Sequence, residues 1–249
     1  MENKIPKIIH YCWFGKSSLP KLAQKCIKSW QKYCPDYQII RWDETNFDIN
    51  SNLYVKQAYE AKKYAFVSDY VRLWALYNYG GIYVDTDLEM VKNIDKFLIH
   101  DFFSGFENSN FVPTAIMGAV PHHPLIKELL DIYQSLSFIK LDRELDLTPN
   151  TVRITDYLVK NYNLKRNNTY QELKNGVFLY PYEYFCANDI TGLKITNNTY
   201  TIHHFQGSWL PLSTKISKNI KMFLAKLIGF NSYYKLKYLK DKVISFLHF

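Results

Sequence analysis

The sequence has few cysteines, and their spacing would neither crosslink a fold nor hold a metal. The four cysteines, at positions 12, 26, 34 and 186, include no C-x-x-C pair and no regular pattern. A chain of 249 residues can bury a sizeable core without crosslinks, so these residues indicate free thiols in a reducing compartment. We therefore expect no disulfide framework and no zinc site.

Long apolar runs, low-complexity segments and internal repeats are also absent. The amino terminus leads directly into an apolar, strand-like segment, which predicts no signal peptide. No stretch approaches the ~20 uninterrupted apolar residues of a membrane-spanning helix. With 47% hydrophobic and 22% charged residues, the composition is typical of a globular chain, and we expect one large domain.

The first 90 residues predict a parallel sheet. Residues 7–15 and 37–43 are apolar and β-branched, which favours strands. Between them, Ala23, Cys26, Ile27 and Trp30 recur at helical spacing, so the three segments together indicate a βαβ unit.

The next segments place two carboxylates at the sheet edge. Residues 55–79 predict one helix, ended by Gly80, and the segment 81–85 predicts another strand. Asp85 and Asp87 would then lie at the carboxyl end of a parallel strand, where open α/β sheets bind ligands. Further along, residues 122–136 predict a helix, whereas 176–185 and 200–205 predict strands of an acceptor-binding half.

The D-x-D pair suits a divalent cation. On a strand, Asp85 and Asp87 point to the same face, because side chains alternate with period two. Carboxylate oxygens favour Mg²⁺ or Mn²⁺, and such an ion can bridge a diphosphate and neutralise the charge of a leaving nucleotide. The alternative is a solvated strand end without a metal.

Two further groups of polar residues extend this prediction. Asp69 and Arg72 lie three apart on a predicted helix, where Asp69 could accept bonds from sugar hydroxyls and Arg72 could contact phosphate. An ordinary intrahelical ion pair is the alternative. In "HHFQGSW", residues 203–209, we expect His204 rather than His203 to complete the metal site, with Ser208 near phosphate; a structural histidine is the alternative.

The run "SDYVRLWALYNYGGIYVDTDLE" strongly resembles the signature of the glycosyltransferase family whose sugar-binding region contains a DXD motif. This group, glycosyltransferase family 32, includes the fungal initiating α-1,6-mannosyltransferases and bacterial capsular polysaccharide transferases. More distantly, it resembles the glucosylating domains of large clostridial toxins. The opening segment "IPKIIHYCWFG" and the closing "GSW" are similar to those of the family. The segment 147–152, "LTPNTV", departs from its Thr-Gly-Pro turn, so no catalytic role is carried onto Asn150 or Thr151.

The resemblance implies a GT-A fold, that is, an α/β fold with a Rossmann-like, mostly parallel central sheet flanked by helices. It also implies retention of anomeric configuration and an Mn²⁺ or Mg²⁺ cofactor. The catalytic residues implied are Asp69, Arg72 and Asp87, with Asp87 as a direct metal ligand. The donor-binding residues implied are Trp13, which stacks on the base, together with Tyr83, Asp69, Arg72, Asp85, Ser208 and Trp209.

The charge of the chain is concentrated at its end. Residues 215–249 hold eight lysines and one aspartate, a net +7, which leaves 23 basic and 22 acidic groups in residues 1–214. Apolar stripes among these lysines predict a helical tail lying on an anionic membrane surface. Helices docked on the domain or forming a dimer are the alternative. Because the body lacks a basic stripe, nucleic acid is not an expected partner.

These observations together predict a catalytic domain over residues 1–214 and a basic amphipathic tail over 215–249. The predicted activity is metal-dependent, retaining transfer of a hexose, with a UDP-hexose favoured. The expected acceptor is a cell-surface polysaccharide or a lipid-linked glycan, with bacterial capsular polysaccharide biosynthesis as the expected context. The expected location is cytoplasmic, peripheral on the inner face of the membrane. Alternatives are a D-x-D phosphohydrolase, which Leu88 and Glu89 after the pair disfavour, and a non-enzymatic membrane-associated glycan-binding protein.

Overall fold

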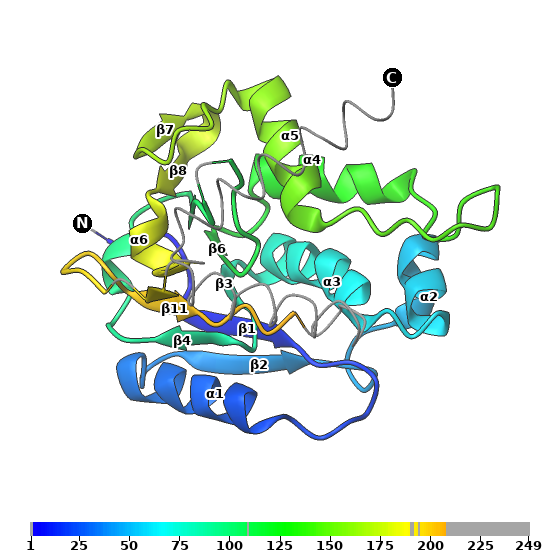
Figure 1. The fold of residues 1–249 in the computed structure, drawn as a ribbon, viewed down its shortest axis with the longest axis horizontal. Coiled ribbons are helices and arrows are strands. Elements are labelled where there is room, and N and C mark those ends of the chain that lie inside the picture. The colour runs from blue at the N-terminus through cyan, green and yellow to red at the C-terminus, as the bar shows by residue number, and fades with distance from the viewer. Residues whose placement is uncertain (1, 109, 190–191, 194, 208–249) are drawn as a thin grey trace, which may run out of the picture. The chain divides into compact units, whose positions relative to one another are not determined.

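A mixed sheet runs through the described part of the protein, with strand order β2-β1-β3-β6-β5-β8-β7 (Figure 1). The computed structural model describes residues 2–108, 110–189, 192–193 and 195–207. The sheet strands are β1 (Ile8–Cys12), β2 (Gln38–Trp42), β3 (Gly81–Val84), β5 (Phe102–Gly105), β6 (Ile116–Ala119), β7 (Gln171–Leu173) and β8 (Val177–Tyr180). Strands β2, β1, β3, β5 and β8 point one way, and β6 and β7 point the other way.

Helices cover both faces of this sheet. They are α1 (Lys21–Tyr33), α2 (Leu53–Glu60), α3 (Tyr64–Tyr79), α4 (Pro124–Gln134), α5 (Asn150–Tyr162) and α6 (Tyr182–Phe185). One core cluster joins α2 to α5 with one face of the sheet, and the other joins α1, α6 and β4 (Leu88–Met90) with the opposite face. The alternation is visible in β3, where Tyr83 enters the first cluster and Ile82 and Val84 enter the second. The expected α/β fold with a mostly parallel sheet is therefore confirmed.

The predicted βαβ unit is confirmed, because β1 and β2 pair in parallel and α1 lies between them in the chain. Helix α1 buries Ala23, Cys26 and Trp30, three of the positions that carried the helical spacing. The indole N–H of Trp30 donates to the Leu88 carbonyl at 2.7 Å. This bond ties α1 to the segment that follows the D-x-D pair.

The prediction of one helix over residues 55–79 is wrong in its continuity. The chain breaks between α2 and α3, where Lys62 has a left-handed φ of +56°. The predicted stop at Gly80 is confirmed: its φ is +63° and its N–H donates to the Leu76 carbonyl. Gly80 is required there, because a Cβ would come within 2.6 Å of the Pro121 ring.

The second half also differs in part from the prediction. The helix expected over 122–136 is present as α4, but the strand expected over 176–185 ends at Tyr180, and α6 begins after Pro181. Strand β11 (Thr201–His203) pairs antiparallel with β4 in a separate two-stranded sheet. Short strands β9 (Asn188–Asp189) and β10 (Gly192–Leu193) pair with each other.

The four cysteines are buried and unpaired, as expected for free thiols. Within the described ranges, no helix has the length and apolar character needed to cross a bilayer. The segment 1–189 with 193–206 forms one compact unit. Ser208, Trp209 and the tail over 215–249 lie outside the described residues, so the boundary at residue 214 and the helical tail stay predictions.

Candidate functional site

The two aspartates of the D-x-D motif lie in a turn that follows β3. Strand β3 ends at Val84, so the pair is not on the strand as predicted. The Asp85 N–H donates to the Ala115 carbonyl at 2.8 Å, and the Leu88 N–H donates to the Asp85 carbonyl at 3.0 Å. This turn, rather than strand alternation, places both carboxylates on the same side.

A histidine completes the group. Asp85, Asp87 and His203 each offer one ligand atom, and these atoms lie within 4.8 Å of one another. The pairing of β11 with β4 brings His203 opposite Leu88, and its Nε2 lies 3.3 Å from Oδ1 of Asp87. Two carboxylates and one imidazole form a donor set suited to a divalent first-row cation.

His204 is not at the pair, which differs from the prediction. Its Nε2 lies 2.9 Å from Oε2 of Glu89, which also accepts a bond from Lys25. Successive side chains of an extended segment point to opposite faces, so only one of the two histidines can face Asp87. The backbone N–H of His204 does contact the Asp87 carbonyl at 3.0 Å.

Asp87 is held from two sides. Its Oδ2 accepts the Gln206 N–H at 2.8 Å, while Oδ1 faces His203. Burial raises the pKa of Asp87, but the bonds from His203 and Gln206 outweigh it and leave the pKa below its usual value. Burial lowers the pKa of His203, yet the Asp87 carboxylate holds it well above its usual value. A bound cation would take the place of the imidazole proton, so the residues fit a metal whose affinity rises with pH.

Arg72 lies at the centre of the buried part of the site. Its guanidinium is 3.0 Å from Asp69 and 3.2 Å from Asp85, and it donates to the Thr114 carbonyl at 2.6 Å. Only 4% of Arg72 is exposed. Although burial lowers its pKa, the charges of Asp85 and Asp69 raise the pKa of Arg72 above its usual range. The intrahelical ion pair with Asp69, which the sequence left open as the alternative, is present, and the guanidinium also binds the metal-ligand candidate Asp85. The predicted contact of Arg72 with phosphate stays a prediction.

Asp69 is a carboxyl group that can be neutral at physiological pH. Burial raises its pKa to about 7, and Arg72 opposes that rise. Asn150, the first residue of α5, donates from its side chain to the Asp69 carbonyl at 3.4 Å and accepts from the Tyr133 hydroxyl at 3.1 Å. Sequence reasoning assigned no role to Asn150. Its contact joins residues 81 positions apart, which no local pattern signals.

Tyr83 and Trp13 lie at the same edge of the sheet. The Tyr83 hydroxyl donates to Oδ1 of Asp85 at 2.9 Å, and its ring centroid lies 4.4 Å from the Arg72 guanidinium carbon. Trp13 follows β1, which is parallel to β3, and its indole N–H donates to the Ser17 carbonyl at 2.7 Å. The donor-binding roles of both residues stay predictions.

A contact that sequence reasoning missed fastens the loop after Trp13. Oε1 of Glu44 accepts the Gly15 N–H at 2.6 Å and the Tyr59 hydroxyl at 3.0 Å. A Cβ at Gly15 would collide with the ring of Tyr64. The segment that carries Trp13 is therefore fixed to residues after β2 and in α2.

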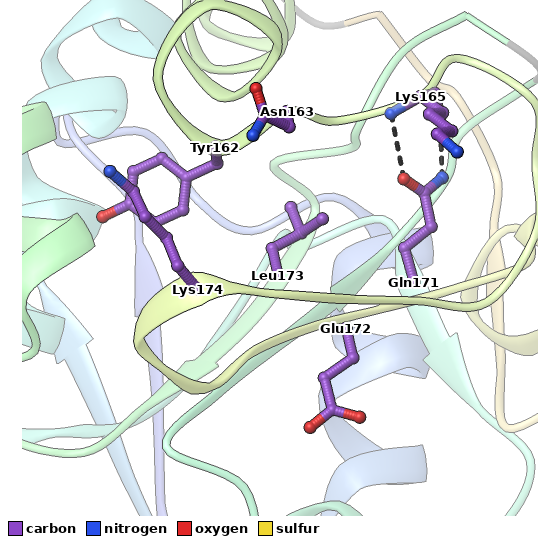
Figure 2. A pocket seen from close by; sticks show the side chains of 7 residues that line it. All are labelled: Tyr162, Asn163, Lys165, Gln171, Glu172, Leu173 and Lys174. Carbon is purple, nitrogen blue, oxygen red and sulfur yellow. Dashed lines mark hydrogen bonds between the residues drawn. The ribbon is translucent and has the colours of Figure 1, made fainter.

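A surface hollow of about 370 Å³ lies elsewhere, between the end of α5 and β7 (Figure 2). Its lining residues are Tyr162, Asn163, Lys165, Gln171, Glu172, Leu173 and Lys174. The Lys165 N–H donates to the side chain of Gln171, and the Gln171 amide donates back to the Lys165 carbonyl (Figure 2). None of its lining residues belongs to the candidate site.

A mostly parallel α/β sheet with an acidic pair after β3, and a histidine of β11 beside that pair, defines a class of protein whose sheet edge can hold a divalent cation. Residues 20–104 match the family described as "Glycosyltransferase sugar-binding region containing DXD motif". The matched region contains α3, β3 and the D-x-D turn. The resemblance inferred from this part of the sequence is confirmed.

Two curated fungal relatives are similar over about half of the chain. Inositol phosphoceramide mannosyltransferase 2 of Schizosaccharomyces pombe is 29% identical over 133 residues, which cover 52% of this chain and 38% of the relative. Mannosyl phosphorylinositol ceramide synthase CSH1 of Saccharomyces cerevisiae is 32% identical over 148 residues, which cover 55% of this chain and 36% of that relative. The chain thus spans less than two fifths of the length of these relatives. Among solved structures, the PaToxG glycosyltransferase is similar with a TM-score of 0.46 and 19% identity, over 63% of this chain and 69% of that chain.

Proposed function

We propose that the protein is a metal-dependent, retaining glycosyltransferase with a GT-A fold, which transfers a hexose from a nucleotide sugar to a glycan or glycolipid acceptor. The observation that carries this proposal is the grouping of Asp85, Asp87 and His203 beside the buried Asp69–Arg72 pair. The match of residues 20–104 to the DXD family supports it.

The three grouped side chains would hold the cation, and the imidazole nitrogen favours Mn²⁺ over the oxygen-preferring Mg²⁺. When bound, the ion would neutralise the charge that develops on the leaving diphosphate. Arg72 fixes the positions of Asp69 and Asp85 through its two ion pairs. Asp69, with a pKa of about 7, can both donate to and accept from sugar hydroxyls at neutral pH.

In this mechanism the acceptor hydroxyl attacks the anomeric carbon from the face that the diphosphate leaves. The new glycosidic bond forms as the bond to the diphosphate oxygen breaks, and the hydroxyl proton passes to the leaving diphosphate. Asp69 is buried and paired with Arg72, a position that supports positioning of the donor rather than covalent attack on it.

The donor and acceptor are narrower parts of the proposal. UDP and GDP donors are both open, and we favour a UDP-hexose; the names of the fungal relatives add mannosyl donors to the candidates. Those names also favour a glycolipid acceptor, with a capsular polysaccharide as the second candidate. We place the enzyme on the inner face of the membrane, held on anionic lipid by residues 215–249, whose net charge is +7.

A panel of UDP- and GDP-sugars with Mn²⁺, scored by donor hydrolysis, tests the activity without an acceptor. We expect one sugar to be hydrolysed, with activity lost on chelation and in Asp87→Asn. The matched control Asp131→Asn alters an exposed carboxylate on α4 and should retain full activity. Full activity in Asp87→Asn, or hydrolysis indifferent to chelation, would contradict the metal assignment.

A further inference from the structure

The segment between α4 and α5 forms a projecting hairpin. We call residues 137–147 the leucine hairpin; it is the green segment that extends past the helices beside α2 (Figure 1). Ile139 and Leu145 pair as an isolated bridge. The Lys140 N–H donates to the Glu144 carbonyl at 2.8 Å, and the Arg143 N–H donates back to the Lys140 carbonyl at 2.9 Å. These bonds define a tight turn with Leu141 and Asp142 at its tip.

The leucine hairpin exposes large aliphatic side chains. Leu141 has a relative exposure of 107%, Leu147 of 50% and Ile139 of 36%. Three of the eight exposed large apolar residues in the described part of the chain thus fall within nine consecutive positions. Tight turns ordinarily carry polar residues, glycine or proline, and a fully exposed leucine contributes nothing to the core. A cluster of this kind indicates a contact surface.

The hairpin is firmly held at its base. Gln57 of α2 accepts bonds from the Ser137 hydroxyl and the Ile139 N–H, both at 3.1 Å. Asp146 is paired with Arg153 of α5. Helix α5 begins at Asn150, whose side chain reaches Asp69 of the candidate site. Nine residues of chain separate Leu141 at the tip from Asn150, so the tip lies at most about 30 Å from the residue that contacts the candidate site.

We propose that the leucine hairpin inserts its tip into the apolar boundary of a lipid bilayer and so presents the candidate site to a lipid-borne acceptor. The proposal rests on the glycosyltransferase function proposed above. Leu141 would enter the acyl region, and Lys140 and Arg143 would extend to the headgroups. Lys140, Asp142, Arg143 and Glu144 carry a net charge of zero, so this contact is apolar in origin.

The geometry favours a bilayer over a second copy of the chain. A stable protein interface buries about 800 Å² on each partner, centred on a packed patch. Three aliphatic side chains on a projecting turn supply less than that, whereas lipid can surround a projecting tip on all sides. The neutral charge also distinguishes this contact from the one proposed for the lysine-rich tail, because only the tail contact weakens with salt.

The test uses the full chain with neutral phosphatidylcholine vesicles in about 1 M salt, where the Debye length is about 3 Å and the electrostatic part of the tail contact is screened. The apolar stripes of the tail are the same in every protein compared, so a difference in binding reports on the hairpin. We expect the wild type to sediment with these vesicles and the double variant L141S/L147S to bind them about tenfold or more weakly. The control V159S/I195S changes two exposed apolar residues elsewhere and should bind like the wild type.

Circular dichroism and donor hydrolysis without acceptor should be equal in all three proteins, which excludes unfolding as the cause. Equal vesicle binding by L141S/L147S, or no binding of wild type to neutral vesicles, would overturn the proposal. A change from dimer to monomer in L141S/L147S by sedimentation equilibrium would also overturn it, since a second copy would then cover the tip. Failure of donor hydrolysis in the wild type would reject the proposed function, while the vesicle assay would still report on the hairpin.

Discussion

Replacing Arg72 by methionine tests whether the stability of the site depends on the buried guanidinium group of Arg72. The change keeps an unbranched stem at this position but removes the guanidinium, and with it the ion pairs to Asp69 and Asp85 and the bond to the Thr114 carbonyl. The guanidinium side chain is 5% exposed and that of Asp69 is 13% exposed, so little water can replace the lost contacts. Removing one partner of a buried ion pair costs about 3–5 kcal/mol. Because the Asp85 side chain is 26% exposed, we expect the lower end, about 3 kcal/mol.

The cost should depend on pH, and its direction follows from Asp69. The folded-state pKa of Asp69 is about 7, above its ordinary 3.8. The stability that comes from holding this proton is present at low pH and is lost as pH rises through the folded pKa. Without Arg72, which lowers it, that pKa moves higher still. The difference in unfolding free energy between variant and wild type should therefore widen above pH 7, by up to about 1.4 kcal/mol per pH unit.

Urea unfolding of wild type and Arg72→Met at pH 6 and pH 8, followed by circular dichroism, measures both effects. The control is Arg166→Met, because Arg166 and its partner Asp156 are both more than a third exposed. That pair should contribute less than about 1 kcal/mol. A cost for Arg72→Met no greater than that of the control, or a cost that shrinks at pH 8, would refute the reasoning.

Three further predictions concern pH, packing and the metal. Burial lowers the pKa of His10 from 6.5 to about 4. The free energy of unfolding, measured by urea titration, should therefore fall by up to about 3 kcal/mol as pH drops from 6.5 to 4, and His10→Gln should lose this pH dependence. Gly118→Ala places a methyl group against the ring of Phe103 and should cost about 1–3 kcal/mol by urea unfolding; a neutral change would contradict it. Saturating Mn²⁺ should stabilise the wild type by about 3 kcal/mol at a hundred times Kd, measured by thermal shift. His203→Ala should lose this stabilisation by Mn²⁺ and His204→Ala should keep it. The reverse result would support His204, the histidine predicted from the sequence, as the metal ligand.

The parts of the fold that the sequence predicted are those with a strong local signal. Helix α1 was predicted from the spacing of its apolar residues. The end of α3 was predicted from Gly80, because glycine readily adopts the positive φ found there. The break between α2 and α3 carries no glycine or proline, and Lys62 adopts its left-handed conformation where no local pattern signals it. Pro181, by contrast, is a local signal for the end of a strand, and the prediction of one continuous strand over 176–185 did not take it into account.

The site was predictable only as far as its residues lie close in sequence. Asp69, Arg72, Asp85 and Asp87 fall within 19 residues, and the structure joins three of them through Arg72. The choice between two adjacent histidines depended on which face of β11 meets β4, and that register is a tertiary property. The contact of Asn150 with Asp69 was hidden for the same reason.

The register of β11 on β4 has a consequence for the synthesis of the protein. Asp87 leaves the ribosome more than a hundred residues before His203, a delay of roughly ten seconds at ordinary rates of synthesis. During that interval the nascent chain carries the acidic pair but lacks the imidazole. Chains that end before β11 consequently lack the histidine of the candidate ligand set, so the group of three side chains can form only after Thr201–His203 has been synthesised.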